Sequence, residues 1–293
     1  MEKLILVGHA CLDEVIIEGK RFDLRVGGAV SYGASAASAL GYRPLLISRV
    51  GKDFTEKHMK FLEKYADLSG VERSNMPSTR FGLIYSGGKR VVKLLARCDD
   101  ISSKQLEKYI TDDAMVHYGL LIREVSKENI ERFRGAISSL DMQGDMRRAD
   151  EKGNVFLERR PLPDVDVIHG EIYEAMLAAG ASTIRDAIAF FEKRDGTSLI
   201  TLDNGGAIVV YNHLSYYVPP ATPRKVVDET GAGDAFSMAF LIELMSEGEP
   251  KWCAAIATSV ASYLIETEGV VINASHKEIE MRAEKIYNRI IQF

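Results

Sequence analysis

VDETGAGDAF, residues 227–236, leads directly into an apolar segment, residues 237–245, whose composition favours a helix. Gly231 and Gly233 allow the backbone to turn tightly and to bring its N–H groups close to a ligand. These groups lie at the start of the expected helix, where the helix dipole adds roughly half a positive charge. The segment therefore predicts a site for an anion, most naturally a phosphate group.

Asp234 lies in the same turn, although a carboxylate beside an anion site is electrostatically unfavourable. The position suits a general base, which accepts the proton of an attacking hydroxyl while the loop amides stabilise a phosphoryl group in transfer. From this segment alone, Asp234 fits equally well as a simple helix cap after a glycine turn. Both interpretations remain open at this point.

The composition is that of an ordinary globular protein: 293 residues, 46% hydrophobic, 27% charged, with a formal net charge of −5. The mild acidity argues against nucleic acid or an anionic membrane as the main partner. The three cysteines form no CxxC motif, and no apolar stretch reaches the ~20 residues of a membrane span. We expect a soluble cytoplasmic protein with reduced thiols.

Strand-like and helix-like segments alternate along most of the chain, a pattern typical of a parallel sheet covered by helices. The expected strands are residues 4–8, 44–50, 115–118, 165–169 and 198–202. The expected helices are residues 28–41, 55–65, 127–138, 182–193, 233–245, 251–266 and 276–291. No linker divides the chain, so we expect a single α/β domain over residues 1–293.

Two segments, residues 14–26 and 79–97, interrupt this alternation with period-two strand patterns. The second contains a turn signal at residues 86–89. We interpret the two segments as a small accessory sheet inserted in the domain, a lid that excludes water from a phosphoryl-transfer site. Two ordinary surface hairpins are the alternative.

Four segments, taken in chain order, resemble the PfkB/ribokinase family of carbohydrate kinases. They are GHACLD (residues 8–13), VGG (26–28) with the small-residue helix that follows, TLDNGG (201–206) and DETGAGDAF (228–236). The resemblance runs over the full length of the chain. It implies a ribokinase-like α/β fold, with a central, mostly parallel sheet flanked by helices and a small β-strand lid.

The resemblance also implies a kinase that uses ATP and Mg²⁺ to phosphorylate a hydroxyl of a small polyol or sugar. Asp234 would be the general base, with an anion hole formed by Gly231, Ala232 and Gly233. Substrate hydroxyls would be held by Asp13, Gly27 and Gly28, since a carboxylate accepts two hydroxyl donors at once. The nucleotide would lie against Thr201, Asp203, Gly206, Asp228 and Thr230, with Asp228 near the metal and the phosphates.

Three positions depart from the family pattern. Tyr32 stands where an asparagine usually contacts a sugar hydroxyl, and Asp203 stands where a glycine is common. The family's Asn-x-x-Glu motif appears here as Glu171-Ile172-Tyr173-Glu174. Glu174 therefore keeps the expected role of holding Mg²⁺ through water, and Glu171 puts a second charge beside it.

Further segments resemble the myo-inositol kinases of the family: the Gly8-His9 start, residues 92–97, and residues 141–144 with Arg147 beyond. Tyr32 agrees with the same subgroup. The implied substrate contacts are Tyr32, Lys93, Arg97, Gln143 and Arg147, although Arg147 also suits the transferring phosphate and the two lid cations also suit a solvated surface. Nucleoside and other sugar kinases, and a sensor that binds sugar without turnover, remain open alternatives.

Three histidines, His9, His117 and His169, fall at expected strands. No acid or cysteine shares a metal-ligand spacing with them, so we interpret them as structural histidines rather than a metal site. For the whole molecule, the resemblance implies a homodimer formed through the lid, with a small molecule as the substrate.

Overall fold

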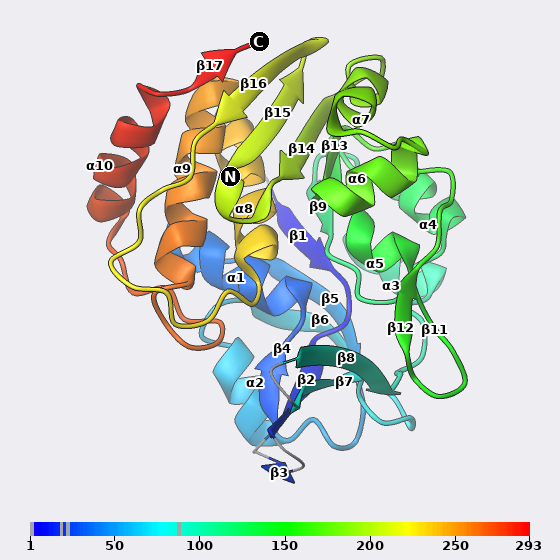
Figure 1. Cartoon of the computed structure of the whole chain (residues 1–293). Coiled ribbons are helices and arrows are strands. Elements are labelled where there is room, and N and C mark those ends of the chain that lie inside the picture. The colour runs from blue at the N-terminus through cyan, green and yellow to red at the C-terminus, as the bar shows by residue number, and fades with distance from the viewer. Residues whose placement is uncertain (1–2, 18–19, 22–23, 87–88) are drawn as a thin grey trace.

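The computed structural model describes residues 3–17, 20–21, 24–86 and 89–293. A central sheet runs through the molecule in the strand order β17-β16-β15-β14-β13-β10-β9-β1-β5-β6 (Figure 1). Neighbouring strands from β6 to β14 are parallel, and those from β14 to β17 are antiparallel. Its described strands are β1 (Leu4–Val7), β5 (Leu45–Val50), β6 (Asp67–Arg73), β9 (Met115–Tyr118), β10 (Ile137–Asp141), β13 (Val167–Glu171), β14 (Thr197–Thr201), β15 (Ala207–Tyr211), β16 (Leu214–Val218) and β17 (Ile291–Gln292).

Helices cover both faces of this sheet. One hydrophobic cluster packs a first group onto one face, namely α1 (Ala29–Ala39), α2 (Glu56–Leu62), α8 (Ala232–Met245), α9 (Pro250–Leu264) and α10 (His276–Tyr287). A second cluster packs the other group onto the opposite face, namely α3 (Ser103–Tyr109), α4 (Lys127–Arg132), α5 (Met142–Met146), α6 (Ile172–Ala179) and α7 (Ile184–Phe191). The chain therefore adopts the α/β architecture expected from its alternating pattern.

The sequence explains this two-faced burial directly. All four residues of β1 are buried, as the uninterrupted apolar run Leu-Ile-Leu-Val requires of a strand covered on both sides. Helix α1 is built mainly from Ala, Ser and Gly, so it packs closely on α8. At Gly33 an added Cβ would meet Leu6 and Met238 at 3.7 Å, which is ordinary contact distance.

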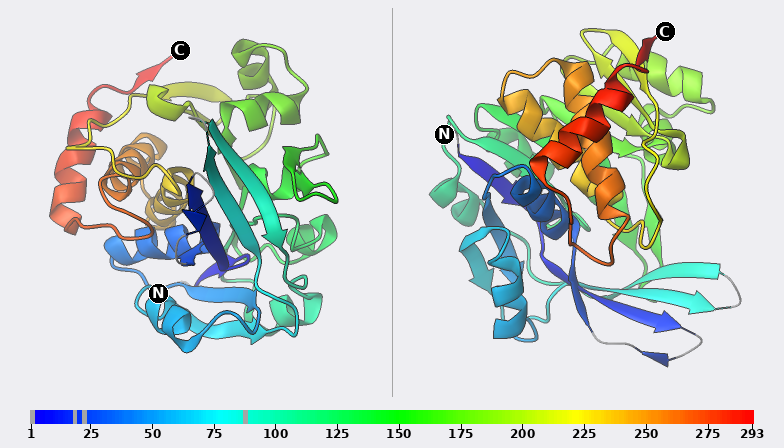
Figure 2. Two further views of the ribbon diagram at one scale, coloured as in Figure 1. Left: turned by 60° about the horizontal axis from the view of Figure 1, so that its bottom comes forward. Right: turned by 90° about the vertical axis from the view of Figure 1, so that its left-hand side faces the viewer.

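A second sheet stands apart from the body of the molecule (Figure 2). It consists of β2 (Cys11–Ile17), β3 (Lys20–Arg21), β4 (Arg25–Gly27), β7 (Arg80–Ser86) and β8 (Lys89–Ala96). The hairpin of β11 (Arg147–Ala149) and β12 (Val155–Leu157) reaches β8 through a bridge between Lys93 and Asn154. The two segments expected to form an accessory sheet do pair with each other. The glycines of the expected turn at residues 86–89 lie outside the described residues.

One expected element is wrong. The helix expected over residues 127–138 ends at Arg132, and the central strand β10 begins at Ile137. Gly135 makes the turn between them at φ +65°, where an added Cβ would lie 2.2 Å from the carbonyl oxygen of Ala114. The pattern Ile-Ser-Ser-Leu-Asp did not identify β10, because its buried serines read as polar positions of a helix.

Candidate active site

A cavity of ≈ 1030 Å³ lies between the second sheet, the start of α8 and the carboxyl ends of the parallel strands. This is the edge at which open α/β sheets bind ligands. The structure brings most of the expected site residues to its wall, from both ends of the chain. Those that line it are Asp13, Gly28, Tyr32, Gln143, Arg147, Glu171, Glu174, Thr201, Asp203, Gly206, Thr230, Gly231, Ala232, Gly233 and Asp234.

Two expected residues lie just behind the wall. At Gly27 an added Cβ would be 2.0 Å from Oδ2 of Asp13, so only glycine leaves room for that carboxylate. Asp228 accepts hydrogen bonds from the backbone N–H groups of Thr230 at 3.0 Å and Gly269 at 3.4 Å. Asp228 therefore shapes the loop that leads into α8 instead of lining the cavity.

Lys93 and Arg97 also lie outside the lining residues. Lys93 lies in β8, where its backbone pairs with Asn154 of the adjoining hairpin. The guanidinium of Arg97 donates to the carbonyl oxygens of Ile122 at 3.4 Å and Arg123 at 3.3 Å. The resemblance implied substrate contacts at both residues, and neither of them reaches the cavity.

The turn before α8 packs against the Tyr32 ring at Gly231. Gly231 has φ +80° and ψ 5°, and an added Cβ would lie 2.2 Å from the Tyr32 ring. The helix then begins at Ala232, and its first residues, Ala232, Gly233 and Asp234, line the cavity. A helix start favours an anion through its N–H groups and the helix dipole, and the anion hole at this loop stays a prediction.

Asp234 lies in the first turn of α8 and lines the same cavity. Burial raises the pKa of Asp234 to about 7, and the Asp141 carboxylate acts in the same direction. His169 and Arg147 lower the pKa of Asp234, since their positive charges stabilise the ionised carboxylate. A carboxylate with this pKa is matched to proton transfer near neutral pH.

Asp141 holds two imidazole rings, one on each neighbouring strand. Nδ1–H of His169 donates to Oδ1 of Asp141 at 2.8 Å, and Nε2 of His117 lies 3.4 Å from Oδ2. Burial opposes ionisation of Asp141, but the two histidines hold its pKa well below the usual value. Burial lowers the pKa of His169, but the Asp141 charge outweighs it, so this pKa lies above the ordinary histidine value.

The histidines were expected to be structural, and in the described part of the chain no group of three or more His, Cys, Asp or Glu side chains is arranged to hold a metal ion. His169 nevertheless lines the cavity and packs beneath the anion-hole loop, where an added Cβ at Gly233 would lie 3.1 Å from its ring. Its Nε2 has no hydrogen-bond partner. The sequence signal for His169 was its position at the carboxyl end of a parallel strand.

Arg147 brings positive charge into the cavity from the start of β11. Its Nη1 donates to the carbonyl oxygen of Leu121 at 3.3 Å, and its guanidinium lies 5.4 Å from the centre of the Phe81 ring. Burial lowers the pKa of Arg147, but a guanidinium stays cationic at any physiological pH. Arg147 can therefore meet either a substrate hydroxyl or a phosphoryl group.

The cavity end next to the second sheet combines polar and apolar groups. Asp13 and Cys11 come from β2, and the Cys11 thiol donates to Oδ1 of Asp13 at 3.3 Å. Burial raises the pKa of Tyr32, with Asp13 and Asp234 adding to the effect, so its hydroxyl stays protonated. Phe81, which sequence reasoning missed, adds an aromatic wall from β7.

The opposite end is formed by the turn after β14. Asp203 has φ +49°, a conformation that favours glycine, which gives a physical reason for glycine being common at this position. Gly206 has φ +90°, and an added Cβ would lie 2.2 Å from the carbonyl oxygen of Val218. Thr201 and Thr230 complete this end, with room left between the turn and the start of α8.

Glu171 and Glu174 were expected to hold Mg²⁺ through water. Glu174 is 3% exposed; its Oε1 accepts from the Gln143 side chain and its Oε2 from the Glu171 backbone N–H, both at 2.8 Å. Burial raises the pKa of Glu174. Glu171 is exposed in the cavity wall. These oxygens fit a magnesium ion that keeps waters and takes its other ligands from phosphates, and they do not form a closed cage.

Residues 1–277 match the model of the pfkB family carbohydrate kinase. A cytidine kinase of Thermococcus kodakarensis is 24% identical over 255 residues, covering 85% of this chain and 91% of that protein. Among the described residues, no helix is long and apolar enough to cross a membrane.

Two solved structures are similar over almost the whole chain. One is a pyrophosphate-dependent kinase in the ribokinase family complexed with a pyrophosphate analogue and myo-inositol: TM-score 0.78, 22% identity, 95% of this chain and 99% of the other. The other is Arabidopsis thaliana ribokinase complexed with ribose and ATP. It has a TM-score of 0.74 and 18% identity, and the match covers 97% of this chain and 99% of the other. Both show that the fold described above is ribokinase-like.

Proposed function

Because the chain belongs to the pfkB family of carbohydrate kinases, we propose that it transfers the γ-phosphoryl group of ATP to a hydroxyl of a small polyol or sugar, with myo-inositol as the acceptor. The observation that carries this proposal is the placement of Asp234. Its carboxyl group, with a pKa of about 7, lies in the first turn of a helix and shares one cavity with Arg147.

In this mechanism the acceptor lies at the Asp13 end of the cavity and ATP lies at the Asp203 end. Asp234 accepts the proton of the acceptor hydroxyl as its oxygen attacks the γ-phosphorus, and the bond to the β-phosphate oxygen breaks to release ADP. The N–H groups of the 231–234 loop stabilise the charge on the transferring group. Arg147 adds a fixed positive charge on the opposite side.

Magnesium enters this proposal through Glu171 and Glu174. When bound, Mg²⁺ supplies positive charge that neutralises the phosphates of the donor. Glu171 would hold it through water, and Glu174 would keep that arrangement in place through its bonds to Gln143 and to the Glu171 backbone. The charge at Glu171, where the family pattern has an amide, suits an ion with a full hydration shell.

Myo-inositol is supported by the chemistry of the acceptor end. It carries six hydroxyls and no charge, so it suits the carboxylate of Asp13, the amide of Gln143 and the guanidinium of Arg147. A structurally similar kinase was solved with myo-inositol bound. The second sheet would then act as a lid over the acceptor, within a single domain of residues 1–293.

A nucleoside is the second candidate acceptor. Phe81, Leu83, Val92 and Leu121 give the acceptor end an apolar wall that an uncharged polyol does not need. An aromatic ring among them can stack on a nucleobase. The cytidine kinase relative supports this candidate in the same way that the inositol complex supports the first.

One substrate panel tests the proposal. The wild-type protein is assayed with Mg²⁺ and ATP, ADP or pyrophosphate against myo-inositol, ribose, fructose, keto-deoxy acids, cytidine and adenosine. We expect turnover with ATP and myo-inositol and a fall of at least ~10²-fold in Asp234→Asn, because the general base is lost. Asp186→Asn, exposed on α7 and outside the cavity, is the matched control. A preference for cytidine selects the nucleoside kinase, and binding of inositol without release of ADP selects a sugar-binding sensor.

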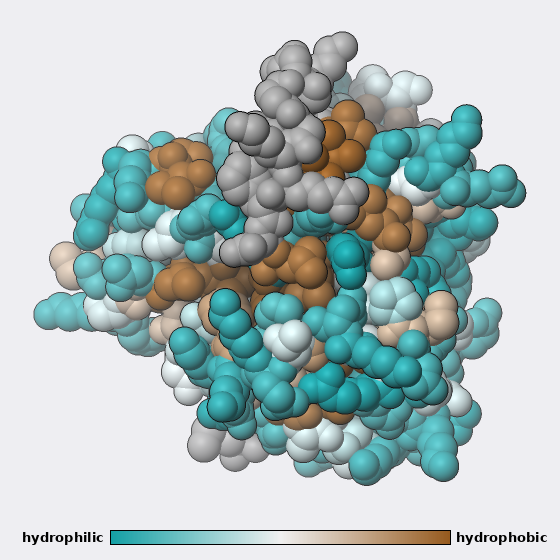
Figure 3. All heavy atoms as spheres, turned by 90° about the horizontal axis from the view of Figure 1, so that it is seen from below, coloured by the Kyte–Doolittle hydropathy of each residue, from teal (hydrophilic) through white to brown (hydrophobic). Residues whose placement is uncertain are grey.

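We also propose a homodimer formed through the second sheet. Its edge strand β8 exposes Val91 (46%) and Leu95 (42%). The face seen from below carries several hydrophobic areas among its hydrophilic side chains (Figure 3). Exposed apolar side chains on a sheet favour cover by a second chain.

A further inference from the structure

Glu124 is a fully buried carboxylate that no motif of the sequence singled out. It lies in the segment after β9, behind the acceptor end of the cavity. Its oxygens accept hydrogen bonds from the backbone N–H groups of His9 at 2.9 Å, Leu121 at 2.8 and 3.0 Å, and Ile122 at 2.8 Å. Burying an ionised group costs several kcal/mol unless its lone pairs are satisfied, and here backbone N–H groups satisfy them.

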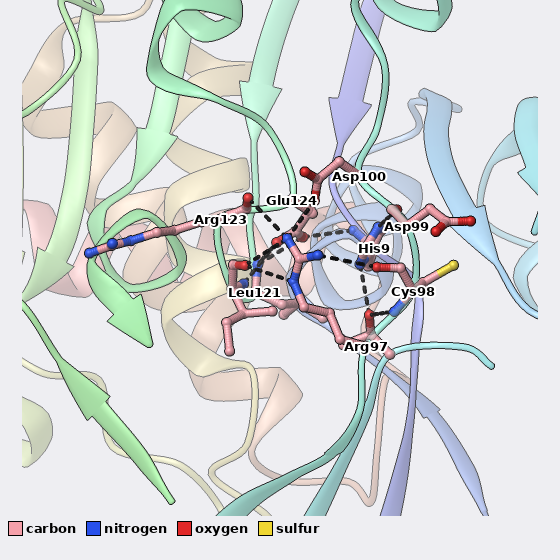
Figure 4. Close-up of polar contacts among 10 residues, drawn as sticks. His9, Arg97, Cys98, Asp99, Asp100, Leu121, Arg123 and Glu124 are labelled. Carbon is pink, nitrogen blue, oxygen red and sulfur yellow. Dashed lines mark hydrogen bonds and ion pairs between the residues drawn. The ribbon is translucent and has the colours of Figure 1, made fainter. Parts of the chain in front are cut away.

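The side chain of His9 extends this contact to the second sheet (Figure 4). Its Nδ1 lies 2.7 Å from Oγ1 of Thr79, and its Nε2 lies 2.9 Å from the carbonyl oxygen of Asp99. Thr79 Oγ1 also accepts from the backbone N–H of Cys98 at 3.0 Å. Residues 79 and 98–99 flank the β7–β8 hairpin, so both ends of this hairpin are tied to the segment that Glu124 holds.

Arg97 closes the same cluster from outside. Its guanidinium donates to the carbonyl oxygens of Ile122 and Arg123 and to that of Cys98, and it pairs with Asp100 (Figure 4). This explains why Arg97 does not line the cavity. Its guanidinium binds backbone carbonyl groups and Asp100 at the base of the second sheet.

The segments held by Glu124 are those that shape the acceptor end. Leu121 lines the cavity, and its carbonyl oxygen accepts from Arg147. At Gly28, an added Cβ would lie 2.7 Å from the carbonyl oxygen of His9 and 3.3 Å from the Leu121 side chain. These segments are therefore packed too closely to leave room for a side chain. By contrast, the turn after β14 that forms the donor end makes no hydrogen bond with this cluster among the described residues.

We propose that Glu124 is a positioning residue for the phosphoryl acceptor. By fixing the backbones of His9, Leu121 and Ile122, it sets the distance between Asp13, on the strand that follows His9, and Arg147, which is bonded to Leu121. Acceptor binding depends on this carboxylate and donor binding does not. The inference rests on the proposed function, in which the two substrates occupy opposite ends of one cavity.

Glu124→Gln tests the inference, because the amide keeps the shape but faces backbone donors with an NH₂ group. The assay uses ATP, Mg²⁺ and the acceptor that the wild-type protein turns over fastest. We expect the KM for the acceptor to rise at least ~10-fold and the KM for ATP to stay within twofold. Asp166→Asn is the matched control: its carboxylate accepts from the Ser138 backbone N–H at 2.8 Å near the amino ends of the strands. Equal changes in both KM values, or the same split in the control, would overturn the inference.

Hydrogen exchange followed by mass spectrometry gives a readout that needs no turnover. In Glu124→Gln we expect faster amide exchange in residues 5–13 and 118–125, and unchanged exchange in residues 197–211. Uniform or unchanged exchange contradicts the positioning role, even if the panel above finds no acceptor and the proposed kinase function fails. Thr79→Val, which removes one hydroxyl from the same cluster, gives a milder second variant if Glu124→Gln does not fold. For it we expect the same pattern with a smaller acceptor effect.

Discussion

Asp234 combines two demands that oppose each other. It must be close enough to the anion hole to reach the attacking hydroxyl, and its negative charge must not repel the phosphate that the hole binds. A carboxyl group with a pKa of about 7 meets both, because it is partly protonated at neutral pH. The same burial has a cost for folding, since an ionised carboxylate is poorly solvated there.

We therefore predict that Asp234→Asn loses turnover and gains stability. The folded pKa of about 7 lies above the ordinary aspartate value of 3.8, so the wild-type carboxyl group contributes most stability below pH ~4 and loses that contribution as the pH rises through about 7. The melting temperature of the variant should exceed that of the wild type at pH 8 by a few degrees, at ~2–4 °C per kcal/mol. The difference should shrink towards pH 4. A variant less stable than wild type at pH 8 would contradict this.

Gly231 gives a second prediction for a single residue. Gly231→Ala puts a Cβ 2.2 Å from the Tyr32 ring, so the anion-hole loop or the ring must move. A displacement of about 1 Å at such a site costs ~10²-fold in kcat/KM. Gly41→Ala is the control, because its φ of +85° is nearly the same as the +80° of Gly231 but its Cβ meets nothing within 4 Å. Both variants should lose ~1–2 kcal/mol of stability from the left-handed backbone, and Gly231→Ala should lose more because of the steric contact. Equal kinetics for the two would refute the steric argument.

At the level of elements, the sequence predicts those helices, strands and turns whose formation depends on residues close together in the chain. The glycine turn before α8 and the all-buried β1 follow from their own residues, and β9 was expected with its observed bounds. The Asp141–His169 contact could not be predicted in this way, because it arises from the register that pairs these two residues across β10 and β13. Glu124 was missed for the same reason: its main partners include His9, which is far away in the chain.

Helix α1 shows how an element can be improved without touching the site. Gly33 is buried in its interior, and an added Cβ would meet Leu6 and Met238 only at ordinary contact distances. Gly33→Ala should raise the free energy of unfolding by ~0.5–1 kcal/mol, because alanine restricts the unfolded chain and favours the helix. Denaturant titration measures this, with kcat and KM unchanged. A loss of stability would mean that α1 and α8 pack more tightly than these distances indicate.

At the scale of the whole molecule, the second sheet is the part that stands out from the body (Figure 2). It projects from the body and is joined to it at the His9–Glu124 cluster (Figures 2 and 4). A homodimer through this sheet would cover the exposed side of β8 and hold the two lids against each other. That arrangement was expected from the family resemblance and stays a prediction.

Light scattering after size-exclusion chromatography tests the dimer. We expect twice the 32.5 kDa of one chain for the wild-type protein. Leu95→Glu, on the exposed side of β8, should give the mass of a single chain, because a charge there is not buried without cost. Met281→Glu on α10 is the control, since Met281 is also exposed (53%) and lies on a helix away from the second sheet (Figure 1). A single-chain mass for the wild type at micromolar concentration would end the dimer proposal.

The packing of α1 on α8 has a consequence for synthesis of the chain. The small residues of α1 emerge from the ribosome early, but their partner helix begins only at Ala232. At 5–20 residues per second, translation of the intervening segment takes ~10–40 s. During that time α1 and the sheet face beneath it are not yet buried by α8, so the nascent chain exposes an apolar surface to which chaperones can bind. The phosphate site is completed only after α8 has been translated.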